Sequence, residues 1–178
     1  ANSGLVVALD ADDLAPFERF PCDPLAGIAL QRELEERAFR LGGNSYAAPA
    51  QRLEDFLAAR PSTRLGGIAA SYQPGVHPAD LDDLLPAAIV EALREALPAF
   101  ARKLKGYDHP DAVLTGVETR TSSPVRIPRD EALESLNVKG LVPAGEGAGY
   151  AGGILSAGID GIRAAEALAI QILRSKHI

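Results

Sequence analysis

Hydrophobic residues return at intervals of three to four positions in four stretches of the chain, with polar residues between them. This period is typical of amphipathic helices, and it predicts helices over residues 23–43, 48–60, 78–104 and 153–174. Pro98 falls inside the third stretch, where its missing N–H predicts a stop or a kink. The last stretch has few charged residues before position 170, so we expect this helix to be buried on most sides.

Shorter apolar runs predict strands between these helices. Residues 4–10 and 139–145 each form one such run, and residues 113–117 and 125–127 flank a polar turn. Residues 130–137 are expected to form a short helix or a turn. The sequence therefore predicts a mixed α/β chain in which helices surround a small sheet.

Composition and charge narrow the functional classes. The 178 residues are 47% hydrophobic, which is enough to bury a core, and the net charge of −6 argues against binding to nucleic acid. No apolar run reaches membrane-spanning length and the N-terminus lacks a signal peptide pattern, so we expect a cytoplasmic protein without a membrane partner. A single cysteine and three scattered histidines predict neither an internal disulfide nor a metal site.

Residues 145–153 form a glycine-rich ribbon between a predicted strand and the last predicted helix. In such a unit the helix N-terminal N–H groups point at an anionic or carbonyl-rich ligand, and glycine lets the backbone approach it. Glu146 lies in this turn, where a carboxylate can accept two hydrogen bonds from a diol, so a polyhydroxylated ligand is predicted. The alternative is that the ribbon only permits close packing, because its spacing matches neither the phosphate loop nor the full dinucleotide fingerprint.

A second polar cluster, "ETRTSSPVRI", spans residues 118–127. Arg120 and Arg126 flank a hydroxyl-rich turn, and together they could clamp a carboxylate. The alternative is a solvated hairpin with surface arginines.

The glycine ribbon, "LTGVETRTSSPVRI" and "GGNSYAAPAQRLEDFL" together resemble the C-terminal portion of bacterial FAD-dependent dehydrogenases, which are NAD(P)/FAD oxidoreductases. The resemblance implies that residues 1–138 are an inserted, substrate-facing domain. It also implies that residues 139–178 are a strand and helix that complete a Rossmann-like FAD-binding domain. The N-terminal dinucleotide-binding motif of that family is absent here. Because the sequence contains no methionine, we expect a piece of a longer protein.

The resemblance also implies which residues would bind FAD. The seven cofactor-binding positions would be Glu146, Gly147, Ala148, Gly149, Gly152, Gly153 and Ile154. Glu146 would hydrogen-bond the ribityl or pyrophosphate part of FAD, and residues 147–149 would run beside the cofactor. The N–H groups of residues 152–154 would face the flavin pyrimidine edge, where the positive helix end stabilises negative charge.

For the substrate, the resemblance favours Arg120, Arg126 and Tyr150 as residues that bind a small molecule near the flavin. Tyr150 could either flank the flavin ring or fill the turn. No residue is identified as a catalytic acid or base, and NAD(P)H is expected only as a co-substrate of the parent.

Two functions follow from this sequence. In the first, the parent is a flavin oxidoreductase, and this chain supplies the substrate-facing domain and one wall of the FAD site. The isolated chain would then be inactive, bind FAD weakly or not at all, and associate with the remainder of its own FAD-binding domain or with another copy of itself. In the second, the chain is a non-catalytic folding or interaction module whose glycine ribbon serves helix packing. Glu146 distinguishes the two, because packing has no need of a carboxylate in the turn.

Overall fold

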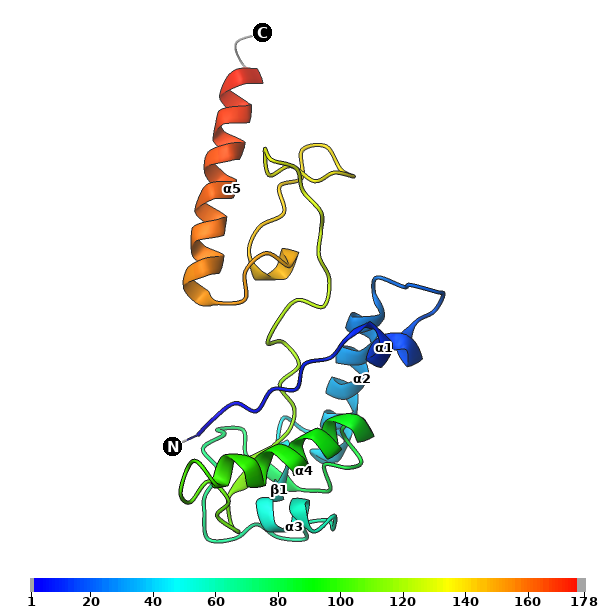
Figure 1. Cartoon of the computed structure of the whole chain (residues 1–178), viewed down its shortest axis with the longest axis vertical. Coiled ribbons are helices and arrows are strands. Elements are labelled where there is room, and N and C mark those ends of the chain that lie inside the picture. Colours follow the sequence, from blue (N-terminus) through cyan, green and yellow to red (C-terminus); the bar gives the residue numbers. More distant parts are fainter. Residues whose placement is uncertain (1, 176–178) are drawn as a thin grey trace. The chain divides into compact units, whose positions relative to one another are not determined.

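The computed structural model describes residues 2–175, and it has the mixed α/β architecture that the sequence predicts (Figure 1). Its contacts divide the chain into two compact units. The first comprises residues 1–14 and 30–118, and the second comprises residues 15–29 and 119–178. The domain boundary predicted at residue 138 stays a prediction.

The described residues form five α-helices, two short 3-10 helices and three strands. In chain order these are α1 (Ala11–Leu14), η1 (Ala15–Phe17), α2 (Ala26–Leu41), β1 (Ala48–Arg52), α3 (Leu53–Leu57), β2 (Val76–Pro78), α4 (Ala87–Ala101), β3 (Val113–Thr115), η2 (Glu146–Ala148) and α5 (Ile154–Ser175).

The three strands make one small sheet in the order β2-β1-β3, with β1 parallel to β2 and antiparallel to β3. The helix predicted over residues 48–60 is therefore wrong in its first part, because α3 begins only at Leu53. Pro49 sits in the central strand although it cannot donate a ladder hydrogen bond. Its carbonyl accepts a hydrogen bond from Gly116 N at 3.0 Å, and Ala48 N donates to Gly75 O at 3.0 Å. The neighbouring backbone groups thus hold the sheet together around the proline.

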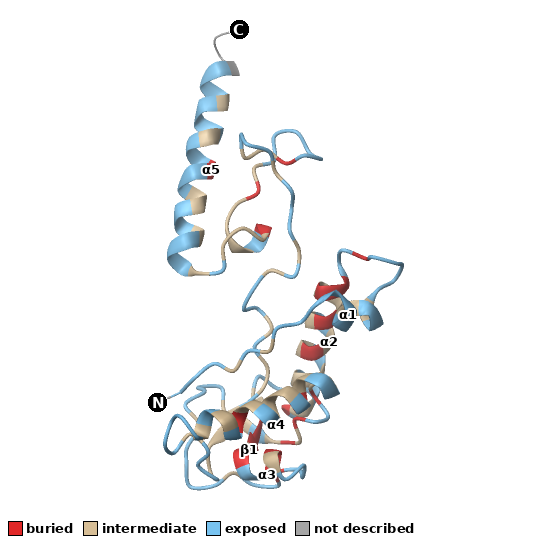
Figure 2. Cartoon of the chain, viewed as in Figure 1, coloured by how far each residue is buried: buried red, intermediate tan, exposed pale blue. Residues whose placement is uncertain are grey.

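The core of the first unit is formed by α3, α4 and the segment that follows β2 (Figure 2). Its fully buried members are Leu53, Phe56, Leu81, Leu84, Val90 and Leu97. Gln51 is also buried, and its side-chain amide is satisfied: Nε2 donates to Arg60 O at 2.8 Å and Oε1 accepts from Leu81 N at 2.9 Å. Pro98 does not stop α4 at once, since the helix ends one turn later at Ala101.

Three of the predicted strands are absent from the described residues. Residues 4–10, 125–127 and 139–145 form no strand, and near the last two there is only an isolated bridge between Arg129 and Ser135. An apolar run becomes a strand only when another strand pairs with it, and none of these runs has such a partner within the described chain. Residues 130–137 form a turn, as expected.

In the second unit, α5 runs beside the irregular segment 119–150 (Figure 1). Its bounds agree with the prediction to within one residue, but the expected burial is wrong. Ile154 is 93% exposed and Leu155 is 83% exposed, and Ala164 is the only buried residue between positions 154 and 174 (Figure 2). No helix among residues 2–175 combines the length and apolar character that crossing a membrane requires.

Candidate functional site

The glycine ribbon folds into a closed turn ahead of α5. Residues 146–148 form η2, and the flanking Gly145 and Gly149 have φ angles of 69° and 82°. Gly149 N donates to Glu146 O at 2.8 Å, and Tyr150 N donates to Gly145 O at 3.1 Å. Glycine at both ends permits these positive φ angles, which other residues adopt only with strain.

Gly149 also allows the ribbon to touch the segment that contains Arg126. A Cβ at position 149 would lie 2.6 Å from Val125 O and 2.9 Å from the Cα of Arg126. Two hydrogen bonds join the same segments: Ile127 N donates to Ala148 O at 3.1 Å, and Ser123 Oγ to Gly147 O at 3.2 Å. The structure therefore brings together the two polar clusters that the sequence singles out.

Tyr150 is held at this junction by contacts from within the chain. Its hydroxyl donates to Ile127 O and accepts from Arg129 N, both at 3.0 Å. The guanidinium carbons of Arg126 and Arg129 lie 4.4 Å and 3.7 Å from the centre of its ring. Tyr150 thus makes a cation–π contact with each of the two arginines.

Arg129 and Asp160 form a bidentate ion pair between the irregular segment and α5. Nη2 donates to Oδ1 at 2.6 Å and Nη1 to Oδ2 at 3.0 Å, and the two side chains are only 10% and 14% exposed. Each partner also contacts the backbone just before η2. Arg129 Nη1 donates to Pro143 O at 2.7 Å, and Asp160 Oδ2 accepts from Gly145 N at 2.8 Å. The pair thus holds the backbone on both sides of Ala144.

These contacts favour the ionised forms of both groups. The Arg129 guanidinium, and secondarily the Gly145 N–H, lower the pKa of Asp160 to about 2. The hydrogen bond to Asp160 raises the pKa of Arg129 above its already high ordinary value.

The pair should make the free energy of unfolding of the second unit decrease when the pH becomes acidic. Because the pKa of Asp160 is lower in the folded chain, its contribution to the free energy of unfolding is complete above about pH 4 and is lost as the pH falls toward about 2. Urea unfolding should show that Asp160→Asn is destabilised at pH 7 and that its deficit shrinks below about pH 4. A matched exposed change on α5, Glu166→Gln, should show no such pH dependence. A deficit of Asp160→Asn that is constant from pH 7 to pH 2.5 would contradict this assignment.

Other polar groups of the ribbon have no partner within the described chain. The Glu146 carboxylate makes no hydrogen bond or ion pair with residues 2–175, and the N–H groups of residues 152–154 likewise donate to none of them. A Cβ at Gly147 or Gly152 would meet no atom within 4 Å. An open carboxylate, open N–H donors and bare backbone fit a ligand that carries both hydroxyl groups and negative charge.

The two arginines predicted to bind substrate have different surroundings. Arg126 is exposed and stacks on Tyr150, and it forms no ion pair with the residues that the structure describes. Arg120 is exposed in the irregular segment after β3. Arg126 therefore contacts the ribbon through Tyr150 and through the approach of Gly149 to its backbone.

Sequence reasoning missed Arg129 and Asp160. The signal for Asp160 was present, since it is one of few charges in an otherwise apolar helix. A charge in such a place needs a partner, but the partner lies 31 positions away and no local pattern identifies it.

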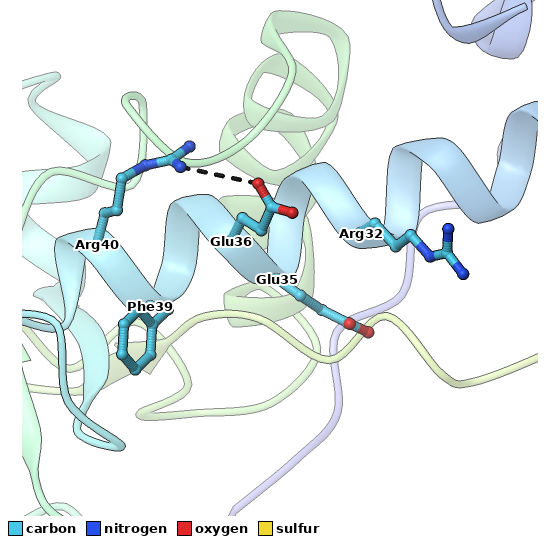
Figure 3. Close-up of a pocket in the computed structure, with 5 residues that line it drawn as sticks. All are labelled: Arg32, Glu35, Glu36, Phe39 and Arg40. Carbon is cyan, nitrogen blue, oxygen red and sulfur yellow. Dashed lines mark ion pairs between the residues drawn. The ribbon is translucent and has the colours of Figure 1, made fainter.

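A shallow hollow elsewhere follows the exposed side of α2 (Figure 3). It is lined by Arg32, Glu35, Glu36, Phe39 and Arg40. Arg40 pairs with Glu36 across one helical turn, with 3.8 Å between Nη1 and Oε2. All the lining side chains come from one helix, whereas ligand sites usually gather polar groups from several elements. We assign no ligand to this hollow.

Comparisons with known proteins give a family for the chain. A family described as "FAD-dependent protein, C-terminal domain-like" matches residues 1–121. A protein of Clostridium beijerinckii, described as uncharacterized, is 50% identical over 166 residues, which cover 93% of this chain and 30% of that protein. The chain therefore spans less than a third of the length of this relative. The family match ends before the glycine ribbon.

Proposed function

Since this chain belongs to the FAD-dependent protein, C-terminal domain-like family, we propose that it is part of a flavin-dependent oxidoreductase, a dehydrogenase, and that it forms one wall of that protein's FAD site. The observation that carries this proposal is the set of unused polar groups at the ribbon. A carboxylate, three N–H donors and bare glycine backbone lie within nine residues, 146–154.

Each part of the ribbon has a role in this proposal. Glu146 accepts hydrogen bonds from hydroxyl groups of the ribityl chain. The backbone of residues 147–149 runs beside the cofactor, and the N–H groups of residues 152–154 hold the electron-rich pyrimidine edge of the flavin. When bound, FAD would supply hydride transfer, and the residues of this chain would bind and orient it.

Arg126 supports a further part of the proposal, the binding of a small substrate. Its guanidinium is exposed, unpaired among residues 2–175, and held over the Tyr150 ring. A guanidinium in such a place suits a carboxylate. We propose an anionic small molecule as substrate, with Arg126 as its contact and NAD(P)H as the electron donor.

The exposed aliphatic face of α5 suggests which partner this chain has. Its exposed members are Ile154, Leu155, Ile159, Ile162, Leu168, Ile170, Ile172 and Leu173. A face of this kind normally contacts another surface. We propose that it packs against the remainder of the parent's FAD-binding domain, because the relative is more than three times as long as the matched region.

The test is to purify the longer parent protein and the 178-residue chain side by side and measure bound flavin by its visible absorbance, then reduction by NADH and NADPH. We expect FAD in the parent, bleaching of its absorbance by one of the two donors, and no flavin in the isolated chain. A parent that holds no flavin and takes up none when FAD is added would overturn the proposal and favour a folding or interaction module.

Sedimentation of the isolated chain tests whether it self-associates through α5, and Ile159→Glu should abolish that self-association.

A further inference from the structure

The Arg129–Asp160 pair joins the irregular segment to α5, and its side chains are only 10% and 14% exposed. It contacts the backbone at Pro143 and Gly145, immediately before Glu146. On the far side of the turn, the ribbon passes into α5, which itself carries Asp160. The ribbon is therefore held to the same helix at both of its ends.

We propose that Arg129 and Asp160 are positioning residues, which fix the Glu146 carboxylate and the N-terminal N–H groups of α5 so that both face one ligand. This inference rests on the proposed FAD site and deepens it. Without the pair, Gly145 would lose its hydrogen bond to α5 and would keep the glycine chain itself and a van der Waals approach to Ala157. Glycine-rich backbone loses more conformational entropy on ordering than any other, so an external contact is needed to hold it in one conformation.

An ion pair at this place also affects the charge next to the ribbon, which an apolar contact would not do. Two charges withdrawn from water gain little net stability over a well-packed apolar pair. A pair does, however, give Gly145 N an ionised acceptor, and Arg129 neutralises the charge of that acceptor beside a turn that we expect to bind an anion. Arg129 thus has two roles, since it orients Asp160 and cancels its negative charge.

These two roles of Arg129 predict different FAD dissociation constants for the two single variants and the double variant. In the parent protein, Arg129→Gln removes the neutralising cation and leaves Asp160 charged, so we expect the FAD dissociation constant to rise roughly tenfold. Asp160→Asn removes that charge and keeps an acceptor for Gly145 N, so we expect a rise of roughly threefold. The double variant should bind FAD better than Arg129→Gln alone, because the uncompensated charge is gone. A purely structural pair would instead change the free energy of unfolding of these variants and leave their FAD dissociation constants equal to that of wild type.

The experiment measures FAD affinity by fluorescence quenching in the four parent proteins, with Glu166→Gln as an exposed control on the same helix and far-UV circular dichroism as the check on folding. Hydrogen exchange without FAD provides a readout that is independent of the flavin. Exchange in residues 143–150 should rise in both single variants and stay unchanged in the control. Arg129→Lys, which keeps the charge without the bidentate geometry, serves if Arg129→Gln does not fold, and it should also raise exchange in this segment.

The outcomes separate this inference from the proposed function. A wild-type parent that binds FAD, with variants that bind it equally or with a double variant that shows no recovery, overturns the positioning role alone. Unchanged exchange in residues 143–150 overturns it as well. A wild-type parent without FAD affinity overturns the proposed function, and the inference fails with it.

Discussion

Replacement of Glu146 by alanine in the parent protein is expected to weaken FAD binding roughly 10- to 100-fold, because a carboxylate that accepts hydrogen bonds contributes about 1.5–3 kcal/mol. The carboxylate contacts none of the described residues, so its removal should leave the free energy of unfolding of the apoprotein within about 0.5 kcal/mol of wild type. This combination of a large effect on the ligand and a small effect on stability marks a binding residue. Titration of the apoprotein with FAD and urea unfolding measure the two quantities.

Two further variants sharpen the result for Glu146. Glu146→Gln keeps one acceptor oxygen and the size of the side chain, so it should retain part of the affinity that alanine loses. Glu166→Ala removes a carboxylate from an exposed position on α5 and should bind FAD as wild type does. Equal affinities of wild type and Glu146→Ala would show that the ribbon carboxylate does not touch the cofactor.

Replacement of Gly149 by alanine should destabilise the second unit by about 2–4 kcal/mol. An alanine here must adopt a φ of 82°, and its Cβ would lie 2.6 Å from Val125 O, which is a backbone atom that cannot move aside as a flexible side chain can. The ribbon would have to separate from the Arg126 segment, with loss of the hydrogen bond from Ile127 N to Ala148 O. Thermal and urea unfolding followed by circular dichroism would measure the loss.

Gly147→Ala is the matched control for this prediction. It lies two residues away in the same turn, and its Cβ would meet no atom within 4 Å. We expect its unfolding free energy to stay within about 1 kcal/mol of wild type. If the two alanine variants unfolded alike, the close contact at Gly149 would not be what fixes the ribbon.

Periodicity in the sequence predicted the long helices well and the short elements poorly. The bounds of α5 agree because Gly152 and Gly153 precede a long helical repeat. The helix predicted over residues 48–60 includes β1 because Leu53, Phe56 and Leu57 have helical spacing and the residues before them show no pattern that separates them from that helix. A five-residue strand around a proline has no local pattern of its own, and only pairing with distant strands determines it.

The burial of α5 could not be predicted from its composition. Apolar residues on most sides of a helix indicate that it should be buried, yet they do not say whether the covering surface belongs to the same stretch of chain. The contacts of the glycine ribbon with other parts of the chain likewise could not be predicted from the sequence. The ribbon and its open carboxylate were visible from spacing and residue type, whereas the approach of Arg126 to Gly149 depends on tertiary contact.

The exposed side chains of α5 have a consequence for the life of the protein in the cell. Eight large aliphatic residues on one helix are the kind of surface that chaperones hold and that quality-control proteases recognise. In the proposed packing of α5 against the remainder of the parent, any mutation that prevents that remainder from folding would uncover this helix, even if every residue of the present chain were intact. The steady-state level of the parent should then fall through degradation, so the abundance of this segment would report on the folding of a region to which it contributes no residue.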